Sequence, residues 1–403
     1  MGKYKHILLF LLFLLPVSLF SEETRDSVSV LKKQRKSTFL SIKGERGFVF
    51  PTNELVREEN ITNYSSLALK YGIMSRGDRW QDIAYGMPYF GIGLYTTTFH
   101  REELGNPISL YLIQGARIAA LTKKITFHYE FNLGYSTNWN TYDPLDNPNN
   151  VAIGSENNVH VGANLYFKFL LNNRLDINVG GSLTHFSNGA TRMPNRGMNL
   201  GSPYIEIAYK FNEPKEKIIS DDLTPPEVNK RLDHDFLLTF SSRQIENNLY
   251  EPLAPKYIDN NFRILGFCYA PMIVSNYLFR WGAGVDVVYD ESRGATSILT
   301  LNPADNRYYE RVTLGEPKER FSVGFSGKGE IVMPHFSFIG GLGYNVLQGN
   351  EKDKRFYQIL GMKIHFYENI FGTFGIRSTH FSKAQFFYWN VGYTIKGRNL
   401  EKK

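Results

Sequence analysis

Apolar and polar positions alternate along most of this chain, in stretches of about ten residues that begin near Gly44. An alternation with period two is typical of β-strands with two different faces, and no segment shows a sustained helical period. The stretches exceed the five or six residues usual in soluble sheets and suit tilted membrane strands of roughly 9–11 residues. The clearest of them are residues 125–138, 159–169, 175–187, 203–211, 279–291, 357–367, 371–382 and 386–395.

The connections between these stretches alternate in length. Residues 122–124 and 170–174 are short, whereas 139–158 is long and rich in Asn, Asp and Pro, and 188–202 is long too. Short turns at one end and long loops at the other are the topology of an outer-membrane barrel.

The alternation alone also fits a soluble β-sandwich, which would bury the apolar row. Strand length, loop alternation and the abundance of Tyr and Phe favour an apolar row that faces lipid. The sequence therefore predicts an all-β fold, an antiparallel transmembrane β-barrel with a small polar interior. The expected interior residues are His128, Glu130, Lys168, Asp176 and Glu206.

The first 21 residues read as a secretory signal peptide. Lys3 and Lys5 precede an apolar run from Ile7 to Phe20, and Ser21 offers a small residue at the junction. No cysteine lies near this junction, and no other stretch of 18 apolar residues exists. An exported chain of this kind can cross a membrane only as a β-barrel.

The chain contains two related halves. Gly134-Tyr135 is echoed by Gly343-Tyr344, and residues 184–187 by 379–382, both of which read Thr-His-Phe-Ser. We expect about eight strands in each half and two tandem eight-stranded barrels; one barrel of about 16 strands is the alternative. The predicted segments are a signal peptide (1–21), an N-terminal extension (22–43), a first barrel (44–211), a polar linker (212–234), a second barrel repeat (235–397) and a tail (398–403).

Composition narrows the classes of protein further. Aromatic residues make up 15% of the 403 residues and charged residues only 21%, which argues against a helical bundle and against disorder. The net charge of +7 includes Lys3 and Lys5 of the leader and is too small to indicate nucleic-acid binding. Cys268 is the single cysteine, which excludes an internal disulfide framework and argues against a cysteine zinc site. No metal or cofactor is expected.

His185 and Ser187 are the candidate catalytic pair. They are two apart on a predicted strand, so their side chains share a face, with Cα atoms roughly 6–7 Å apart. Ser187 would attack an ester carbonyl after His185 takes its proton, and Asn188 and Gly189 would supply oxyanion donors. The alternative is that His-X-Ser is a common tripeptide at a strand end.

The residues around this pair resemble a known active-site signature. His185-Phe186-Ser187-Asn188-Gly189, then residues 194–199 and a final aromatic strand, are similar to the outer-membrane lipid A 3-O-deacylases (PagL-type, acyloxyacyl-hydrolase-like). The resemblance lies in the first half. It implies an eight-stranded barrel whose serine and histidine face the outer leaflet and hydrolyse an ester-linked hydroxyacyl chain of lipid A.

The resemblance has two departures. The family's third catalytic member is a glutamate, and its position here is Asn199. An asparagine can orient the imidazole but cannot stabilise imidazolium as an anion does; Glu206 faces the predicted lumen, and Glu156 remains possible. In the second half His380-Phe381-Ser382 is followed by Lys383 without the long loop, so we interpret it as a degenerate copy.

Weaker candidates complete the sequence analysis. Arg192 and Arg196 flank the candidate pair and could bind lipid A phosphates, although a basic loop explains them equally well. Residues 142–150 offer oxygens for calcium, but a solvated loop is the simpler interpretation. Asp286, Asp290 and Glu291 lie at one strand end without an identifiable partner.

The resulting hypothesis is an outer-membrane serine esterase that acts on the lipid A of lipopolysaccharide. The alternative from another class is a catalytically inactive, structural or porin-like barrel; phospholipase activity is a third possibility.

Overall fold

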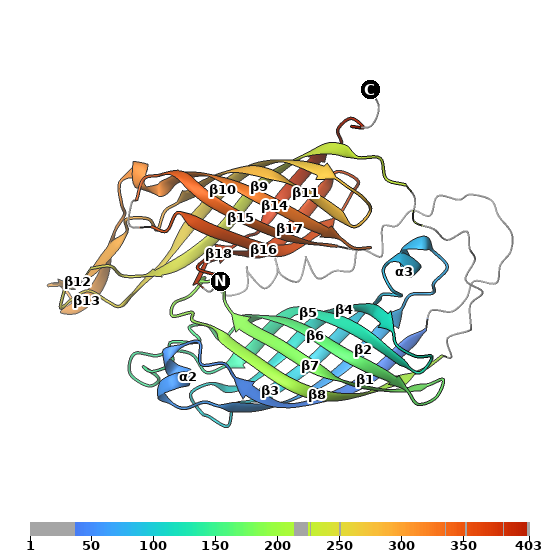
Figure 1. Cartoon of the computed structure of the whole chain (residues 1–403). Helices are drawn as coiled ribbons and strands as arrows, with labels where there is room; N and C mark the ends of the chain where they lie inside the picture. The colour runs from blue at the N-terminus through green and yellow to red at the C-terminus, as the bar shows by residue number, and fades with distance from the viewer. Residues whose placement is uncertain are drawn as a thin grey trace.

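The computed structural model describes residues 37–212, 225, 227–249, 251–334, 336–350, 353–381 and 383–400. Antiparallel strands dominate and form two barrels that lie side by side (Figure 1). The predicted signal peptide lies outside the described residues, as do most of the predicted N-terminal extension and much of the linker. No helix in the described part is both long and apolar enough to cross a membrane.

The first barrel is a closed ring in which each strand pairs with the next and β8 returns to β1. It begins at Thr38, before the predicted Gly44, because β1 pairs with β8 as far as Lys210. Helices α2 (Glu54–Glu58) and α3 (Trp80–Ala84) lie in its first two connections. The strands are β1 (Thr38–Val49), β2 (Asn63–Met74), β3 (Tyr89–Thr98), β4 (Gly105–Ala120), β5 (Ile125–Trp139), β6 (Asn158–Leu170), β7 (Leu175–Ser187) and β8 (Met198–Lys210).

The second barrel closes through pairing of β16 with β17. Two short strands share its last position: β18 pairs with one part of β17, and β19 pairs with another part and with β9. A hairpin of β12 (Thr296–Asn302) and β13 (Arg307–Thr313) extends from it, followed by the short helix η2 (Pro317–Arg320). The strands of the ring are β9 (Arg231–Glu246), β10 (Tyr257–Val274), β11 (Phe279–Asp290), β14 (Phe321–Val332), β15 (Ser337–Gln348), β16 (Phe356–His365), β17 (Ile370–Thr379), β18 (Lys383–Phe387) and β19 (Asn390–Ile395).

Two tandem barrels are therefore confirmed, and the alternative of one barrel of about 16 strands is wrong. A single ring would require β8 to pair with β9, but the structure places them in separate sheets. The physical reason is that β1 already satisfies the free edge of β8, which leaves no unpaired backbone groups for β9.

Most connections alternate in length as predicted, but the linker-end connection 75–88, which contains α3, is longer than the loop-end connection 99–104. We call the end with the long connections, such as 140–157, 188–197 and 291–320, the loop end. The opposite end, the linker end, has the tight turns 121–124 and 171–174. In Figure 1 the loop end carries α2 and the β12–β13 hairpin, and α3 lies at the linker end.

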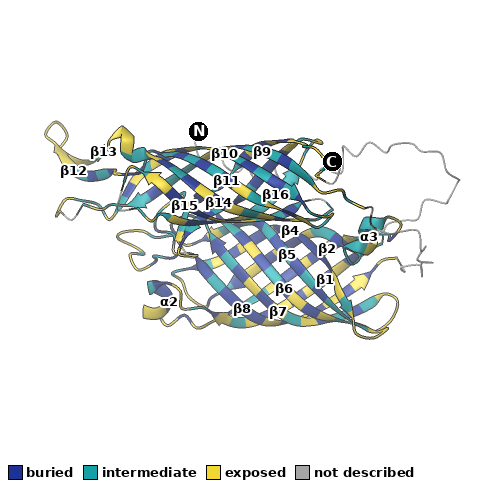
Figure 2. Ribbon diagram, turned by 45° about the horizontal axis from the view of Figure 1, so that its top comes forward, coloured by how far each residue is buried: buried dark blue, intermediate teal, exposed yellow. Residues whose placement is uncertain are grey.

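The outer surfaces of the barrels are apolar and the interiors are polar. In β7, Val179 and Leu183 are 42% and 58% exposed, whereas Asp176 and Asn178 are only 2% and 3% exposed. The same alternation forms stripes over both barrels (Figure 2). Water would not stabilise so large an apolar surface, whereas lipid would. The fold is therefore an antiparallel transmembrane β-barrel, as predicted, and not a soluble sandwich.

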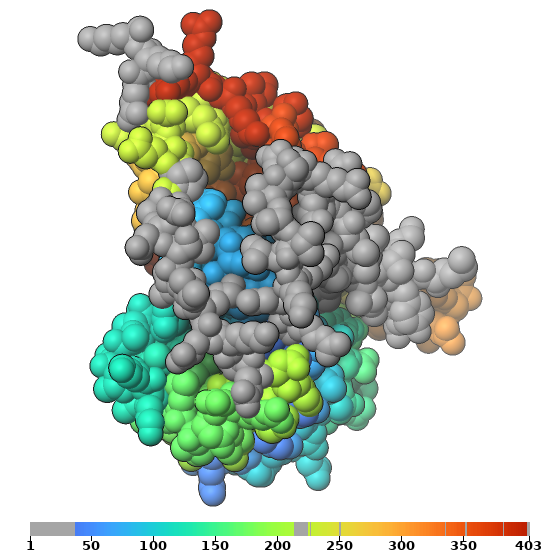
Figure 3. All heavy atoms as spheres, turned by 90° about the vertical axis from the view of Figure 1, so that its right-hand side faces the viewer, coloured from blue at the N-terminus to red at the C-terminus, as the bar shows by residue number. Residues whose placement is uncertain are grey.

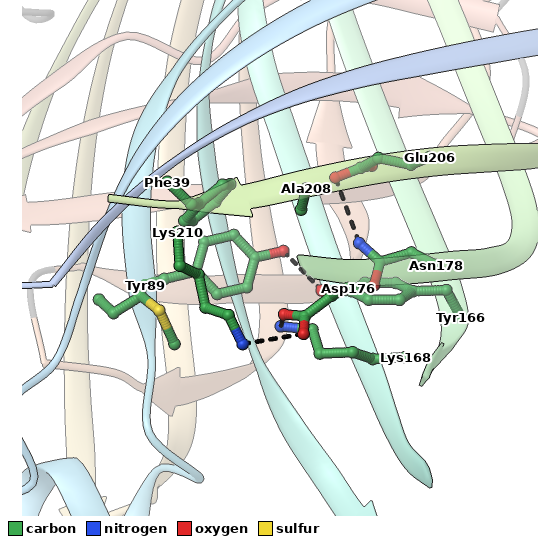
Figure 4. A pocket seen from close by; sticks show the side chains of 10 residues that line it. Phe39, Tyr89, Tyr166, Lys168, Asp176, Asn178, Glu206, Ala208 and Lys210 are labelled. Carbon is green, nitrogen blue, oxygen red and sulfur yellow. Dashed lines mark hydrogen bonds and ion pairs between the residues drawn. The ribbon is translucent and has the colours of Figure 1, made fainter. Parts of the chain in front are cut away.

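Paired charges fill the interior of the first barrel. The Lys70 ammonium lies 2.9 Å from a carboxylate oxygen of Glu130 and 2.6 Å from one of Glu206. Nearer the linker end, Lys210 donates to Asp176 over 2.8 Å (Figure 4). Such pairing offsets the cost of removing charges from water. His128, Glu130, Asp176 and Glu206 are buried in this interior as predicted, and Lys168 contacts Asp176 at 4.0 Å.

The two barrels contact one another along their length. At the linker end the Tyr85 hydroxyl donates to the Tyr277 carbonyl over 3.1 Å, and the Trp80 and Tyr277 rings lie 5.6 Å apart. Figure 3, viewed from this end, shows the blue surface around α3 between the two barrels. The rings of Phe131 and Phe338 also meet, with centroids 4.5 Å apart. The second barrel thus lies directly against the first.

Candidate functional site

Strands β7 and β8 bring the candidate residues together at the loop end of the first barrel. His185 lies directly opposite Asn199 in the strand register, and Ser187 is the last residue of β7. All three are partly buried and share the outward row with the exposed Leu183. The imidazole and the hydroxyl therefore project on the lipid-facing side of the barrel, not into its interior.

A hydrogen bond between side chains orients the imidazole. The Nδ1 atom of His185 lies 2.7 Å from Oδ1 of Asn199, and the Asn199 amide nitrogen donates to Thr52 Oγ1 over 2.8 Å. Because Thr52 holds the amide nitrogen, the amide oxygen faces the imidazole, so Nδ1 carries the proton. Nε2 is then the basic nitrogen.

Thr52 was not predicted from the sequence as a residue of this site. It follows β1 in the chain, far from His185, and no local pattern connects the two.

Gly197 packs closely against both candidate catalytic side chains. Its backbone is left-handed, with φ +69°, which favours glycine. A Cβ atom there would lie 2.9 Å from Cε1 of His185 and 3.5 Å from Cβ of Ser187. The imidazole and the serine therefore approach the same point, and only glycine leaves room for them.

The predicted oxyanion residue Asn188 is engaged within its own loop. Its N–H donates to Asn195 Oδ1 over 3.0 Å, and its side chain donates to the Arg192 carbonyl over 2.9 Å. Gly189 follows with φ +61°. The Asn195 amide nitrogen is buried without an acceptor among the described residues. The amide nitrogen of Asn195 is thus an available hydrogen-bond donor next to Asn188, the residue that follows the serine. Asn195 was not among the residues predicted for the site.

The two arginines of the loop differ in their surroundings. Arg192 is exposed, whereas Arg196 lies 3.1 Å from Glu246 of the second barrel and 3.9 Å from Glu54. Arg196 is therefore already paired with carboxylates, and Arg192 is the better placed of the two for an external phosphate.

Neither alternative carboxylate lies at the imidazole. Glu206 faces the interior and pairs with Lys70 at 2.6 Å. Glu156 is exposed in the loop between β6 and β5. Asn199 is the side chain that contacts Nδ1 of His185.

The second copy of the motif has a different geometry. Strand β17 ends at Thr379, and His380 and Phe381 form a tight turn with φ of +52° and +57°. Ser382 lies outside the described residues, and β18 begins at Lys383. His380 therefore does not lie on a strand, and no loop corresponding to 188–197 follows it.

The remaining candidates have structural partners. Asp143 accepts from the N–H groups of Leu145 and Asp146, which lowers the pKa of Asp143, as expected for a solvated turn. Asp286 accepts from Ser326 and Tyr357. Within the described ranges, no group of three His, Cys, Asp or Glu side chains could hold a metal ion.

Two further carboxylates of that strand end also have partners. Asp290 pairs with Arg243 at 2.8 Å, and Glu291 accepts from the Arg263 N–H over 2.9 Å. Cys268 is buried in β10 as a packed residue.

Comparison with known proteins gives one family and several distant structures. Residues 234–397 match the family described as acyloxyacyl hydrolase, C-terminal domain. No curated protein sequence matches the chain. The siderophore receptor PirA from Acinetobacter baumannii is similar at 10% identity and a TM-score of 0.26, over 86% of this chain and 56% of that one.

The alcaligin outer membrane receptor FauA from Bordetella pertussis is also similar, at 10% identity and a TM-score of 0.21. That likeness covers 90% of this chain and 66% of the receptor. The chain thus spans less than two thirds of the length of these two receptors. At such low sequence identity and TM-score, neither similarity assigns a function.

The family match lies in the second half, whereas the sequence analysis placed the resemblance in the first, so that part of the prediction needs correction. The short signature around Ser187 drew attention to the first barrel, but the family model recognises the strands of the second. The second barrel is thus similar to the C-terminal domain of the acyloxyacyl hydrolases, which is consistent with the predicted resemblance to a PagL-type family.

Proposed function

We propose that this chain is an outer-membrane serine esterase that hydrolyses an ester-linked (3-hydroxy)acyl chain of lipid A. Ser187 is the nucleophile and His185 the general base. The observation that carries the proposal is the 2.7 Å contact between His185 and Asn199, on the lipid-facing row and beside Ser187. The match of the second barrel to an acyloxyacyl hydrolase domain supports the reaction class.

The proposed reaction follows from the proton positions. Nε2 of His185 accepts the proton of Ser187 as the serine oxygen attacks the ester carbonyl. The tetrahedral intermediate collapses to an acyl-serine, and His185 returns the proton to the departing alcohol. Water activated by the same imidazole then releases the fatty acid. Asn199 keeps the imidazole oriented, and the Asn195 amide is a donor for the oxyanion.

The location of the site supports a lipid substrate. The outward rows of both barrels are apolar, and His185 and Ser187 lie where that surface meets the loop end. Acyl chains of a surrounding leaflet reach this rim from the side, without entering the barrel. With the predicted signal peptide, this favours the outer membrane, and lipopolysaccharide as the substrate and partner.

Removal of the serine hydroxyl tests the proposal. Cells that express the wild-type chain should contain lipid A with one fewer hydroxyacyl chain by mass spectrometry, and cells with Ser187→Ala should not. Ser382→Ala, in the second copy of the motif, is the matched control and should behave as wild type. Identical lipid A spectra from wild type and Ser187→Ala would reject the esterase.

A specific observation favours the inactive-barrel alternative: an amide, not a carboxylate, contacts the imidazole. That alternative predicts no acyl release from any lipid. A panel of lipopolysaccharide and glycerophospholipids, tested with the purified protein, separates lipid A deacylase, phospholipase and inactive barrel.

A further inference from the structure

The loop that follows Ser187 is bound by the second barrel. Gln244, near the end of β9, donates its backbone N–H to the Ala190 carbonyl over 2.9 Å. Its side-chain oxygen accepts from the Met193 N–H, also over 2.9 Å. One residue of the second barrel therefore holds the loop at two backbone positions.

The side chain of Gln244 is itself fixed in place. Its amide nitrogen donates to Asp259 Oδ1 over 2.9 Å, and the residue is only 7% exposed. Because Asp259 holds the nitrogen, the amide oxygen is directed at Met193. The hydrogen bond to Met193 is partly buried, and a buried amide oxygen without a donor would cost free energy.

The second barrel makes two further contacts with the same loop. Arg196 pairs with Glu246 at 3.1 Å. The ring of Phe387 lies 2.6 Å from where a Cβ of Gly189 would be, so the second barrel packs directly on the loop backbone.

The loop in turn shapes the surroundings of the serine. Asn195 accepts from the Asn188 N–H, and Gly197 packs on His185 and Ser187. Ala190 and Met193 lie between these two ends of the loop. A constraint on them is therefore transmitted to the residues that contact the candidate catalytic pair.

We propose that the second barrel positions the catalytic loop of the first, with Gln244 as the principal positioning residue. This inference rests on the proposed esterase function and deepens it. It gives the second half of the chain, in which the copied His-Phe-Ser motif lacks a loop, a role in the activity of the first. Because both barrels are on one chain, their contact needs no encounter between separate molecules.

Three variants of the full-length chain test the inference. Gln244→Leu removes the oxygen that accepts from Met193 and retains the backbone N–H. Gln244→Glu combined with Asp259→Asn exchanges donor and acceptor, which restores both side-chain hydrogen bonds. Gln348→Leu is the matched control, since Gln348 donates to Asn350 and Asp353 within the second barrel.

Two readouts keep the inference separate from the esterase proposal. Hydrogen–deuterium exchange in detergent micelles reports the protection of residues 188–197 without any reaction. Acyl release from lipopolysaccharide reports activity. We expect faster exchange in this loop and about tenfold slower acyl release in Gln244→Leu. The double variant should restore both values, and Gln348→Leu should change neither.

The outcomes are distinguishable. Unchanged exchange in Gln244→Leu would overturn the inference, whether or not the wild type is an esterase. Faster exchange with unchanged acyl release would also overturn it, because the loop would then not need to be held. Equal acyl release by wild type and Ser187→Ala would instead reject the esterase proposal, while the exchange data would still report on the barrel contact.

Discussion

At the scale of single residues, the amide of Asn199 occupies the place where the resembled family has a carboxylate. Its geometry is complete, because Thr52 binds the nitrogen and His185 meets the oxygen at 2.7 Å. What the amide lacks is the negative charge that stabilises imidazolium as the serine proton is transferred. The proposed site thus has an oriented imidazole but lacks the negative charge of a triad carboxylate.

The charge of this position is testable by substitution. We expect Asn199→Glu to raise the rate of acyl release by at least about tenfold, because a carboxylate stabilises imidazolium and can still accept from Thr52. Asn199→Leu should lower the rate, since it leaves the imidazole unoriented. Initial rates on purified lipopolysaccharide measure both. A rate for Asn199→Glu no greater than that of wild type would show that imidazolium formation does not limit the reaction.

At the scale of elements, the site depends on a loop that returns tightly to its own barrel. Residues 188–197 leave β7 and re-enter β8 at Met198. The last loop residue, Gly197, combines a left-handed φ of +69° with close packing on His185. The loop therefore sets the distance between the imidazole and the serine as much as the strands do.

Gly197→Ala tests this close packing. The added methyl group would lie 2.9 Å from His185 Cε1 and 2.9 Å from the Phe186 carbonyl, in a backbone conformation that alanine disfavours. We expect acyl release to fall by about tenfold or more while the barrel still folds, as judged by heat-modifiable gel migration. Gly181→Ala on β7 is the control, because its Cβ would approach no atom closer than 3.9 Å. Equal activity of the two variants would contradict this view of the loop.

At the scale of the whole molecule, apolar surfaces face outward and paired charges lie inside. The Lys70 ammonium balances two carboxylates, Glu130 and Glu206, at the centre of the first barrel. Each charge is buried, so each depends on its partner. This packed interior argues against an open pore through the first barrel and so against the porin-like alternative.

Lys70→Met tests the contribution of this network to stability. The variant leaves two buried carboxylates without their common cation, which should lower the free energy of unfolding by about 3–5 kcal/mol. Urea titration of the detergent-folded protein, followed by tryptophan fluorescence, measures the difference. The exposed Lys123→Met is the control and should change the free energy little. A similar midpoint for both variants would show that water, not Lys70, solvates Glu130 and Glu206.

Much of this architecture was predictable from periodicity. In β7 the alternation placed His185 and Ser187 on the apolar row, and the structure has that row outermost. The interior positions of Glu130, Asp176 and Glu206 followed from the same parity. A period of two is a property of the extended backbone itself, so it is readable wherever a strand is long. Most loop lengths were also predictable, because they follow from where the alternating stretches end along the chain.

Contacts between distant parts of the chain were not predictable in this way. Whether β8 pairs with β1 or with β9 depends on which strand edge is available, and this is not a property of neighbouring residues along the chain. The sequence also carried no pattern that joined Thr52 to Asn199 or Gln244 to Met193, because such hydrogen bonds depend on one pair of atoms and have no period. Likewise, the short signature around Ser187 did not indicate that the family match would fall on the second barrel.

The amino-acid sequence by itself thus determined the class of fold, the polarity of each strand face and the common face of the candidate pair, because these follow from neighbouring residues along one strand. Only the tertiary structure decided that there are two rings, that Thr52 orients Asn199, and that the second barrel contacts the loop after Ser187. These features require residues far apart in the chain to meet. Closure of the first barrel brings Thr52 to Asn199, and packing of the two barrels against one another brings Gln244 to Met193.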